Sequence, residues 1–454
     1  MKPLHTLCAT VAMALALSAP GLADDSRSTA VGSDGTVYVA RTGLYGALFA
    51  GVPANRSSAP VLALDVTSAD GTSSRILVPG TDDANLEDSA VVLLQEPTGD
   101  LYILWSSRNG AAASLLLRSY ARGKFSNGVV LDDNPQAQKT APQIGITRDS
   151  YTTTDARGTT RAVQRTVLHL LWWESDSARG SAMYRSVLFV NGDLVGADSL
   201  IDLGDLDAAT VEPDAAKVTA SLIQSPMLAP GRNEHAAIMA FVNPRTGRLL
   251  TFEAAVVPGE LSALADDLRE YMVGTAEQTG LDDIVKIADL VRVHLIGGGR
   301  RFSDGVLLAL GEEIRAHLIG GGRSGIDAVG LAEDSRRFLL RAGADLLANG
   351  LDSPELPPNS SAIIELPVDD AGATHQLQLR IMGRHRAPVT AESANRIYTS
   401  PDGARLLVAW DAPSTLRYSE LRGEEWSAPL GIKLGPALSL DAAASALARR
   451  VREH

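Results

Sequence analysis

The stretch "RTVLHLLWWES", residues 165–175, is the clearest member of a set of segments that decides the fold. It is a short apolar run that ends on aromatic residues, and a turn and a second apolar run, "AMYRSVLFV" (182–190), follow it. The same order returns in "GDLYILWSS" (99–107) with "SLLLRSY" (114–120), "HAAIMAFVN" (235–243) with "RLLTFEAAVV" (248–257), "ARLLVAWDA" (404–412) with "TLRYSEL" (415–421) and, more weakly, "GTVYVARTG" (35–43) with "PVLALDV" (60–66).

The aromatic residues of these segments recur at a nearly constant spacing, as Trp105, Trp172 and Phe241 illustrate. A fixed period of short antiparallel strands is typical of blades arranged around an axis. The sequence therefore predicts a mainly β protein, a β-propeller of about five four-stranded blades. A sixth could be hidden by the insertion described below. The rival fold is a β-sandwich, which does not require the strand–aromatic–turn–strand order to return on schedule.

Two hairpin segments carry a family resemblance. "SYARGKFS" (119–126) and "SELRGEEW" (419–426) each place a glycine four residues after a serine, with Trp426 at the aromatic position of the second and Phe125 near that position in the first. This spacing resembles a degenerate Asp-box (BNR) hairpin of the sialidase-like β-propellers, although Ala121 and Leu421 occupy the aspartate position. The resemblance implies that each segment is a turn on the outer side of a blade, away from a catalytic centre. The glycine would supply a backbone conformation that other residues resist.

A different pattern occupies residues 260–350. Apolar side chains at helical spacing, such as Ile284, Ile287, Val291 and Leu295, replace the strand pattern, and glycines follow each run. We expect a helical subdomain inserted between strands of one blade. The predicted organisation is a signal peptide at 1–23, propeller segments at 24–259 and 351–436 on either side of a helical insertion at 260–350, and a C-terminal helix at 437–454.

The first residues predict export. Lys2 precedes an apolar run from Leu7 to Leu17, and the small residues Gly21 and Ala23 suit a signal peptidase that cleaves after Ala23. Cys8, the one cysteine of the chain, lies inside this segment, so the mature chain would form neither a disulfide nor a thiolate metal site. We expect a periplasmic or secreted protein.

Composition narrows the classes of partner. The chain has 45% hydrophobic and 21% charged residues, which is typical of a folded globular protein, and a formal net charge of −13. An acidic surface disfavours nucleic acid and anionic lipid. No later segment is apolar for long enough to span a bilayer, so we expect no membrane insertion. The expected partner is a glycan or a protein.

Candidate ligand-binding residues follow the strand aromatics. Adjacent tryptophans could stack on sugar rings, and a carboxylate after them could bind hydroxyl groups or act in a glycosidase. The candidates are Trp172, Trp173, Glu174, Asp176, Trp410 and Asp411. A carboxylate after a strand is also an ordinary start to a polar turn, and no catalytic set can be assigned.

Metal and nucleotide motifs receive less support. Asp202, Asp205 and Asp207 could bind calcium through clustered oxygens, but a solvated acidic loop is the alternative, and no other cofactor is predicted. The segment "GGGRSG" (320–325) matches a dinucleotide fingerprint in letters only, because it follows a predicted helix rather than a strand. His294 and His317 are paired by the repeated "HLIGGGR", but nothing nearby completes a ligand set.

Two functions therefore stay open. The leading hypothesis is an exported, non-enzymatic recognition protein that presents its loops to a glycan or protein, because the scaffold repeats and no acid, base or nucleophile stands out. The alternative is a sialidase-like glycoside hydrolase that acts on extracellular carbohydrate. A further possibility is that the helical insertion itself binds the partner.

Overall fold

The computed structural model describes the chain from residue 27 to residue 452 with gaps. The described residues are 27–82, 86–95, 99–109, 112–132, 134–154, 160–175, 180–197, 200–206, 226–231, 235–279, 284–298, 304–320, 328–349, 363–365, 377–386, 396–400, 405–422, 425–435 and 438–452. The predicted signal peptide lies outside them.

Within the described residues, the β body consists of five antiparallel sheets. Sheet 1 contains β1 (Arg27–Val31), β2 (Val37–Leu44), β3 (Pro60–Thr67) and β4 (Ser73–Leu77), with the short helix α1 (Tyr45–Leu48) after β2. Sheet 2 contains β5 (Leu86–Gln95), β6 (Leu101–Asn109), β7 (Ala112–Ala121), β8 (Lys124–Phe125) and β9 (Val129–Val130). Sheet 3 contains β10 (Gln138–Thr154), β11 (Thr160–Ser175), β12 (Gly180–Val190), β13 (Asp193–Ala197) and β14 (Ile201–Asp202).

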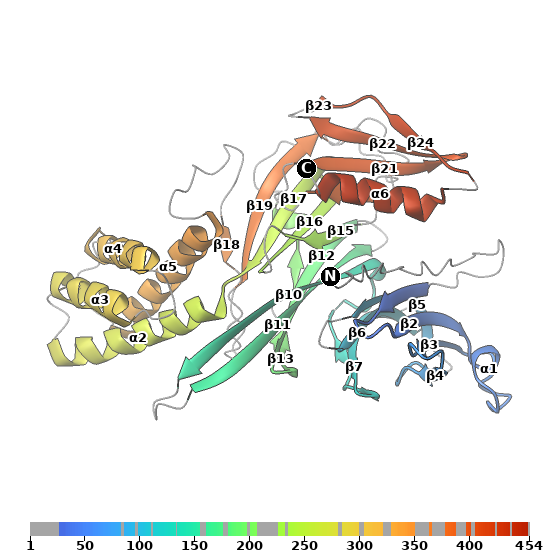
Figure 1. Cartoon of the computed structure of the whole chain (residues 1–454), viewed down its shortest axis with the longest axis horizontal. Coiled ribbons are helices and arrows are strands. Elements are labelled where there is room, and N and C mark those ends of the chain that lie inside the picture. The colour runs from blue at the N-terminus through green and yellow to red at the C-terminus, as the bar shows by residue number, and fades with distance from the viewer. Residues whose placement is uncertain are drawn as a thin grey trace, which may run out of the picture.

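Sheets 4 and 5 complete the β body. Sheet 4 contains β15 (Met227–Pro230), β16 (Ala236–Asn243), β17 (Arg248–Val256), β19 (Leu377–Arg386) and β18 (Ile363–Glu365), in this spatial order. Sheet 5 contains β20 (Arg396–Thr399), β21 (Leu406–Ala412), β22 (Thr415–Arg422), β23 (Glu425–Trp426) and β24 (Leu430–Lys433). In Figure 1 the sheets follow one another around the β body from blue to red.

The mainly β prediction is confirmed, and the repeated segments are the second and third strands of the sheets. Residues 165–175 fall in β11, which pairs with β12 from Arg165↔Val190 to Ser175↔Gly180. The other segments give the pairs β2–β3, β6–β7, β16–β17 and β21–β22. Each described sheet is open at its edges. The strand pairing therefore shows separate antiparallel sheets and does not by itself show a ring of blades.

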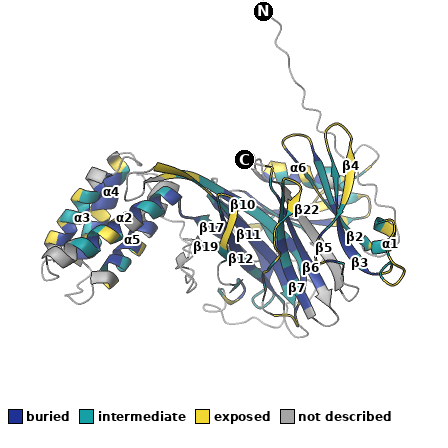
Figure 2. Cartoon of the chain, turned by 90° about the horizontal axis from the view of Figure 1, so that it is seen from below, coloured by how far each residue is buried: buried dark blue, intermediate teal, exposed yellow. Residues whose placement is uncertain are grey.

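The core lies between consecutive sheets, because the second strands are buried on both faces. In β6, Leu101, Ile103 and Trp105 pack toward sheet 1, whereas Tyr102 and Leu104 pack toward sheet 3. All eight residues of β16 are buried in the same way, between sheets 3 and 5. Full burial of one large apolar side chain stabilises a fold by roughly 1.5–3 kcal/mol. This alternation therefore holds neighbouring sheets together, which Figure 2 shows as dark blue strands in the interior.

The C-terminal helix α6 (Leu440–Arg452) covers the remaining face of sheet 5. Ala443, Leu447 and Val451 pack on Leu407, Ala409, Leu416 and Tyr418. Polar contacts at the end of the helix add to this packing. Arg450 donates a hydrogen bond to the hydroxyl of Tyr418 (2.9 Å) and lies near Glu420, whose pKa is lowered chiefly by its hydrogen bond from Arg405. The helix is therefore a packing element of the β body.

The helical lobe, defined as helices α2 to α5, is inserted between the paired strands β17 and β19. Its buried residues form a core of their own, and in both views it stands beside the sheets. His294 stacks on Tyr271 and His317 stacks on Phe338, each with ring centroids 4.0 Å apart, so both histidines serve packing between helices. The helices are α2 (Gly259–Thr279), α3 (Ile284–Gly298), α4 (Asp304–Gly320) and α5 (Ala328–Asn349).

One titratable group is fully buried in sheet 3. His169 lies in the middle of β11, where its Nδ1 is 2.7 Å from the hydroxyl of Tyr184 and its Nε2 is 3.0 Å from Oγ1 of Thr147. Burial lowers the pKa of His169 from 6.5 to about 3, because the imidazolium would lose its hydration. The ring is therefore neutral in the folded protein at neutral pH.

This pKa predicts an acid-sensitive core. In the unfolded chain His169 takes up a proton near pH 6.5, but the folded protein resists protonation to about pH 3. The contribution of neutral His169 is therefore present above pH 6.5 and is lost as the pH falls toward 3, by up to about 4–5 kcal/mol. Urea unfolding between pH 7 and pH 4 should show a steeper loss for the wild type than for His169→Gln. Equal slopes for the two proteins would contradict the prediction.

Candidate functional site

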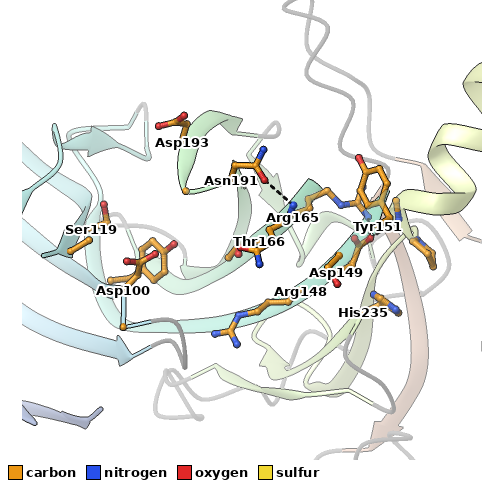
Figure 3. A pocket seen from close by; sticks show the side chains of 18 of the residues that line it. Asp100, Ser119, Arg148, Asp149, Tyr151, Arg165, Thr166, Asn191, Asp193 and His235 are labelled. Atoms are coloured by element: carbon orange, nitrogen blue, oxygen red, sulfur yellow. Dashed lines mark hydrogen bonds and ion pairs between the residues drawn. The ribbon is translucent and has the colours of Figure 1, made fainter. Parts of the chain in front are cut away.

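A cavity of about 870 Å³ lies where three sheets and the helical lobe meet, and we call it the junction cavity. Figure 3 shows its side chains converging from the end of β10 and the start of β11. Sheet 2 contributes Gly99, Asp100, Tyr102, Ser119, Ala121 and Arg122; sheet 3 contributes Arg148, Asp149, Ser150, Tyr151, Gln164, Arg165, Thr166, Asn191, Gly192 and Asp193; the remaining wall is His235 with Pro258, Gly259 and Glu260.

Two hairpin turns form part of this cavity, and positive φ angles place them there. Arg122 and Gly123 have φ of 51° and 78°, and Asn191 and Gly192 have φ of 52° and 87°. Two successive residues with positive φ match the right-handed twist of the flanking strands in a two-residue hairpin. The segment 119–126 is therefore a joint between β7 and β8, as predicted. It also lines a cavity through Ser119, Ala121 and Arg122.

The most buried charges of the cavity are Asp149 and Arg165, which we call the junction pair. Nη2 of Arg165 is 2.7 Å from Oδ2 of Asp149, and the two side chains are 7% and 6% exposed. Arg165 also donates to the carbonyl of Val257, and the N–H of Gly259 donates to Asp149. The pair therefore ties the β10–β11 hairpin to the first residues of the helical lobe.

The junction pair has unused hydrogen-bonding capacity. Oδ1 of Asp149 and Nε of Arg165 are buried, and neither has a hydrogen-bond partner among the described residues. A buried polar atom that makes no hydrogen bond costs about 1–3 kcal/mol, more when charged. Each of these two atoms therefore has hydrogen-bonding capacity that a hydroxyl group, which both donates and accepts, could satisfy if it reached them.

Tyr151 and Gly259 form the tightest contact at this junction. A Cβ at Gly259 would overlap the ring of Tyr151, so any other residue where α2 begins would force the ring or the helix to shift. This contact and the junction pair bring β10 to the N-terminus of α2, two elements far apart in the sequence. The cavity thus has one wall from the sheets and one from the lobe.

The sequence-predicted ligand residues lie at the opposite end of β11 from the junction cavity. Trp172 and Trp173 are 0% and 4% exposed and pack on opposite faces of sheet 3, so their rings offer no face to a sugar. Glu174 accepts hydrogen bonds from Nδ2 of Asn134 (2.9 Å) and Nε1 of Trp172 (3.3 Å). Asp176 lies outside the described residues.

In sheet 5 the predicted tryptophan is likewise buried and the carboxylate after it forms polar contacts. Trp410 is buried in the core between sheets 4 and 5, whereas Asp411 is exposed and pairs with Arg396 at 3.3 Å. Glu174 and Asp411 belong to sheets that sheet 4 separates, and neither lines the junction cavity. A ligand role for these two carboxylates stays a prediction.

The acidic residues proposed for calcium are bound to an arginine. Arg245 pairs with Asp202 at 3.0 Å and with Asp205, and Asp202 also accepts the N–H of Gly204. Asp207 lies outside the described residues. Within the described part of the chain, no group of three His, Cys, Asp or Glu residues could hold a metal ion. A calcium role stays a prediction.

Sequence reasoning missed the junction pair and the residues around it. Arg165 was visible only as a charged residue at the start of a buried strand, and Asp149 as one polar residue of a long polar segment. Periodicity cannot connect Asp149 with Gly259, because the contact spans 110 residues. The only local sign of this contact in the sequence was Gly259, directly after Pro258.

Comparisons with known proteins add little. No family model and no curated protein matches this chain. One similar solved structure is that of a proposed 6-phosphogluconolactonase from Bacteroides uniformis ATCC 8492, which has 12% sequence identity and a TM-score of 0.25. The match covers 89% of this chain and 86% of that chain. So low a TM-score carries no conclusion about this chain. Within the described residues, no helix is long and apolar enough to cross a membrane.

The contact between Gly259 and Tyr151 predicts a position-specific effect of alanine in α2. Gly259→Ala should lower the free energy of unfolding by about 1–3 kcal/mol, because overpacking forces the lobe away from β10. Hydrogen–deuterium exchange should rise around residues 257–261 in this variant.

The matched control is Gly274→Ala in the same helix, where a Cβ would meet nothing within 4 Å. It should raise stability by up to about 1 kcal/mol, because alanine favours helix more than glycine does. The prediction fails if both variants change stability in the same direction.

Proposed function

We propose that the five sheets are blades of a propeller-like body and that the protein is an exported recognition protein that binds a glycan in the junction cavity. The observation that carries the proposal is the cavity itself, which combines volume with converging polar groups. Cavities of about 300–1,000 Å³ are the usual size for small ligands, and 870 Å³ falls in this range.

The cavity lining supports a hydroxyl-rich ligand. Ser119, Ser150, Thr166, Gln164 and Asn191 provide hydroxyl and amide groups, which both donate and accept hydrogen bonds. Tyr151 adds an aromatic ring with a polar end, whereas Tyr102 is only 2% exposed and packs in the core between sheets 2 and 3. Arginines and carboxylates both line the cavity, and Arg165 neutralises Asp149, so no single charge sign dominates. A sugar, with many hydroxyl groups and apolar ring faces, matches this combination.

Recognition is favoured over catalysis by the state of the most buried carboxylate. Asp149 is ion-paired with Arg165 and hydrogen-bonded to Gly259, so it is committed to holding the lobe. A catalytic carboxylate in a glycosidase must face the bond that is cleaved, whereas Oδ2 of Asp149 is occupied by Arg165 and by the N–H of Gly259. The role that these contacts support for Asp149 is therefore structural, at the base of the lobe.

A hydrolase is the second candidate, because further carboxylates line the same cavity. Asp100, Asp193 and Glu260 come from sheet 2, sheet 3 and the lobe, and glycosidases use pairs of carboxylates on either side of the bond they cleave. Any sugar that binds should therefore be incubated with the protein and assayed for released products. Turnover that disappears in Asp100→Asn or Glu260→Gln, with binding intact, would replace recognition by hydrolysis.

Glycan binding is tested with purified residues 24–454 on a glycan array, with and without calcium. We expect binding to one sugar class. Thr166→Arg places a long side chain in the cavity and should weaken that binding by at least about tenfold, or 1.4 kcal/mol.

Glu174→Gln is the matched control from the far end of the same strand, and it should bind like the wild type. The reverse pattern would transfer the site to the end of β11 that carries the tryptophans. No binding to any sugar would leave a protein partner as the hypothesis to test by pull-down.

A further inference from the structure

The helical lobe and the β body each form part of the wall of the junction cavity. Pro258, Gly259 and Glu260 are the residues through which the chain enters the lobe, and all three line the cavity. Val257, directly before them, belongs to the hydrophobic core of the lobe and accepts a hydrogen bond from Arg165. A rotation of α2 against β10 must therefore change the shape of the cavity.

The four helices of the lobe pack together as one unit. Its core residues come from all four helices and exclude the sheets, apart from Val257 at the junction. Ion pairs between α3 and α4, Arg292–Glu312 at 2.6 Å and Arg315–Asp289 at 2.8 Å, hold those two helices together. Figures 1 and 2 show the lobe beside the sheets, with the β10–β11 hairpin and α2 at its base.

The junction pair is the element through which cavity and lobe interact. Asp149 accepts a hydrogen bond from the first N–H of α2, and Arg165 donates one to the carbonyl of Val257. Both side chains are therefore bonded to the base of the lobe. Oδ1 of Asp149 and Nε of Arg165 have no hydrogen-bond partner among the described residues, at a cost that a ligand hydroxyl could recover. Both atoms are buried, so a ligand can reach them only after the two side chains or the base of the lobe shift.

We propose that the helical lobe is a movable wall of the junction cavity and that ligand occupancy and lobe orientation are coupled through Asp149 and Arg165. The ligand site itself rests on the proposed function. Coupling of this kind is reciprocal, because a ligand that favours one lobe orientation is bound more tightly whenever that orientation is favoured. Anything that fixes the lobe would thus regulate binding in the cavity.

The experiment measures the distance between lobe and β body by fluorescence energy transfer. Residues 24–454 contain no cysteine, so two can be introduced and labelled at exposed positions. Leu308→Cys in the lobe and Leu430→Cys in sheet 5 are 48% and 41% exposed. The probes are maltotriose, cellotriose and triacetylchitotriose. Thr166→Arg adds a long side chain to the wall and perturbs the cavity without any ligand.

We expect the transfer efficiency to change in Thr166→Arg and with any probe that binds. Asp149→Asn keeps the size of the side chain but removes its charge, and it should reduce the change to less than about half. Glu174→Gln should leave it intact. A probe that binds without moving the lobe overturns the coupling and leaves the glycan site standing.

If no probe binds, the transfer efficiency measured in Thr166→Arg tests the coupling. A shift in this variant that Asp149→Asn suppresses supports the coupling even if the ligand is not a sugar. An unchanged distance overturns it. A shift that persists fully in Asp149→Asn shows that the junction pair does not carry it, which also overturns the proposal.

Discussion

Burial of the second strand on both faces is the constraint on which the rest of this structure depends. A strand such as β16, in which every residue is buried, can be stable only if a neighbour covers each side of its sheet. The sheets therefore pack in chain order, with Met239 and Phe241 facing one neighbour and Ala240 and Val242 the other. Sheet 5 meets the same requirement with α6, since Ala443, Leu447 and Val451 occupy the place of a further sheet.

The same constraint determines where polar chemistry can occur. Because apolar side chains fill the space between sheets, polar groups are confined to the ends of strands or must be fully hydrogen-bonded inside. His169 illustrates the second case, with partners on both ring nitrogens. Asp149 and Arg165 illustrate the first, because β10 and β11 extend past the neighbouring strands and carry these charges to the edge of the core. The junction cavity forms at this edge.

Much of the fold could be predicted from the sequence, because local patterns encode it. The paired apolar runs gave the second and third strands of all five sheets, and the change to helical spacing near residue 260 marked the lobe. The hairpin at 119–126 was also predictable, since Gly123 adopts a positive φ that glycine favours. These features depend on neighbours in sequence, which a single chain displays directly.

The site could not be predicted, because it depends on contacts between distant segments. Trp172 and Trp173 suggested a sugar platform, yet their very size directs them into the core on opposite faces of β11. The contacts that build the cavity join Asp149 to Gly259 and sheet 2 to sheet 3, and no periodicity relates these positions. Charged residues at strand ends are common, so only the three-dimensional arrangement distinguishes the pair with unused hydrogen-bonding capacity.

The place of the insertion follows from the pairing of the strands around it. β17 ends and β19 begins at the same end of sheet 4, where Val256 pairs with Leu377, and the segment between them also contributes the edge strand β18 on the far side of β19. A long insertion at such a position costs little additional loop entropy, because its ends are already held together by the sheet. That end of the sheet is also where the junction cavity lies, and the first residues of the insertion line it. A lobe inserted at this end of the sheet therefore contacts the cavity by geometry alone, which gives the proposed coupling between the two a simple structural origin.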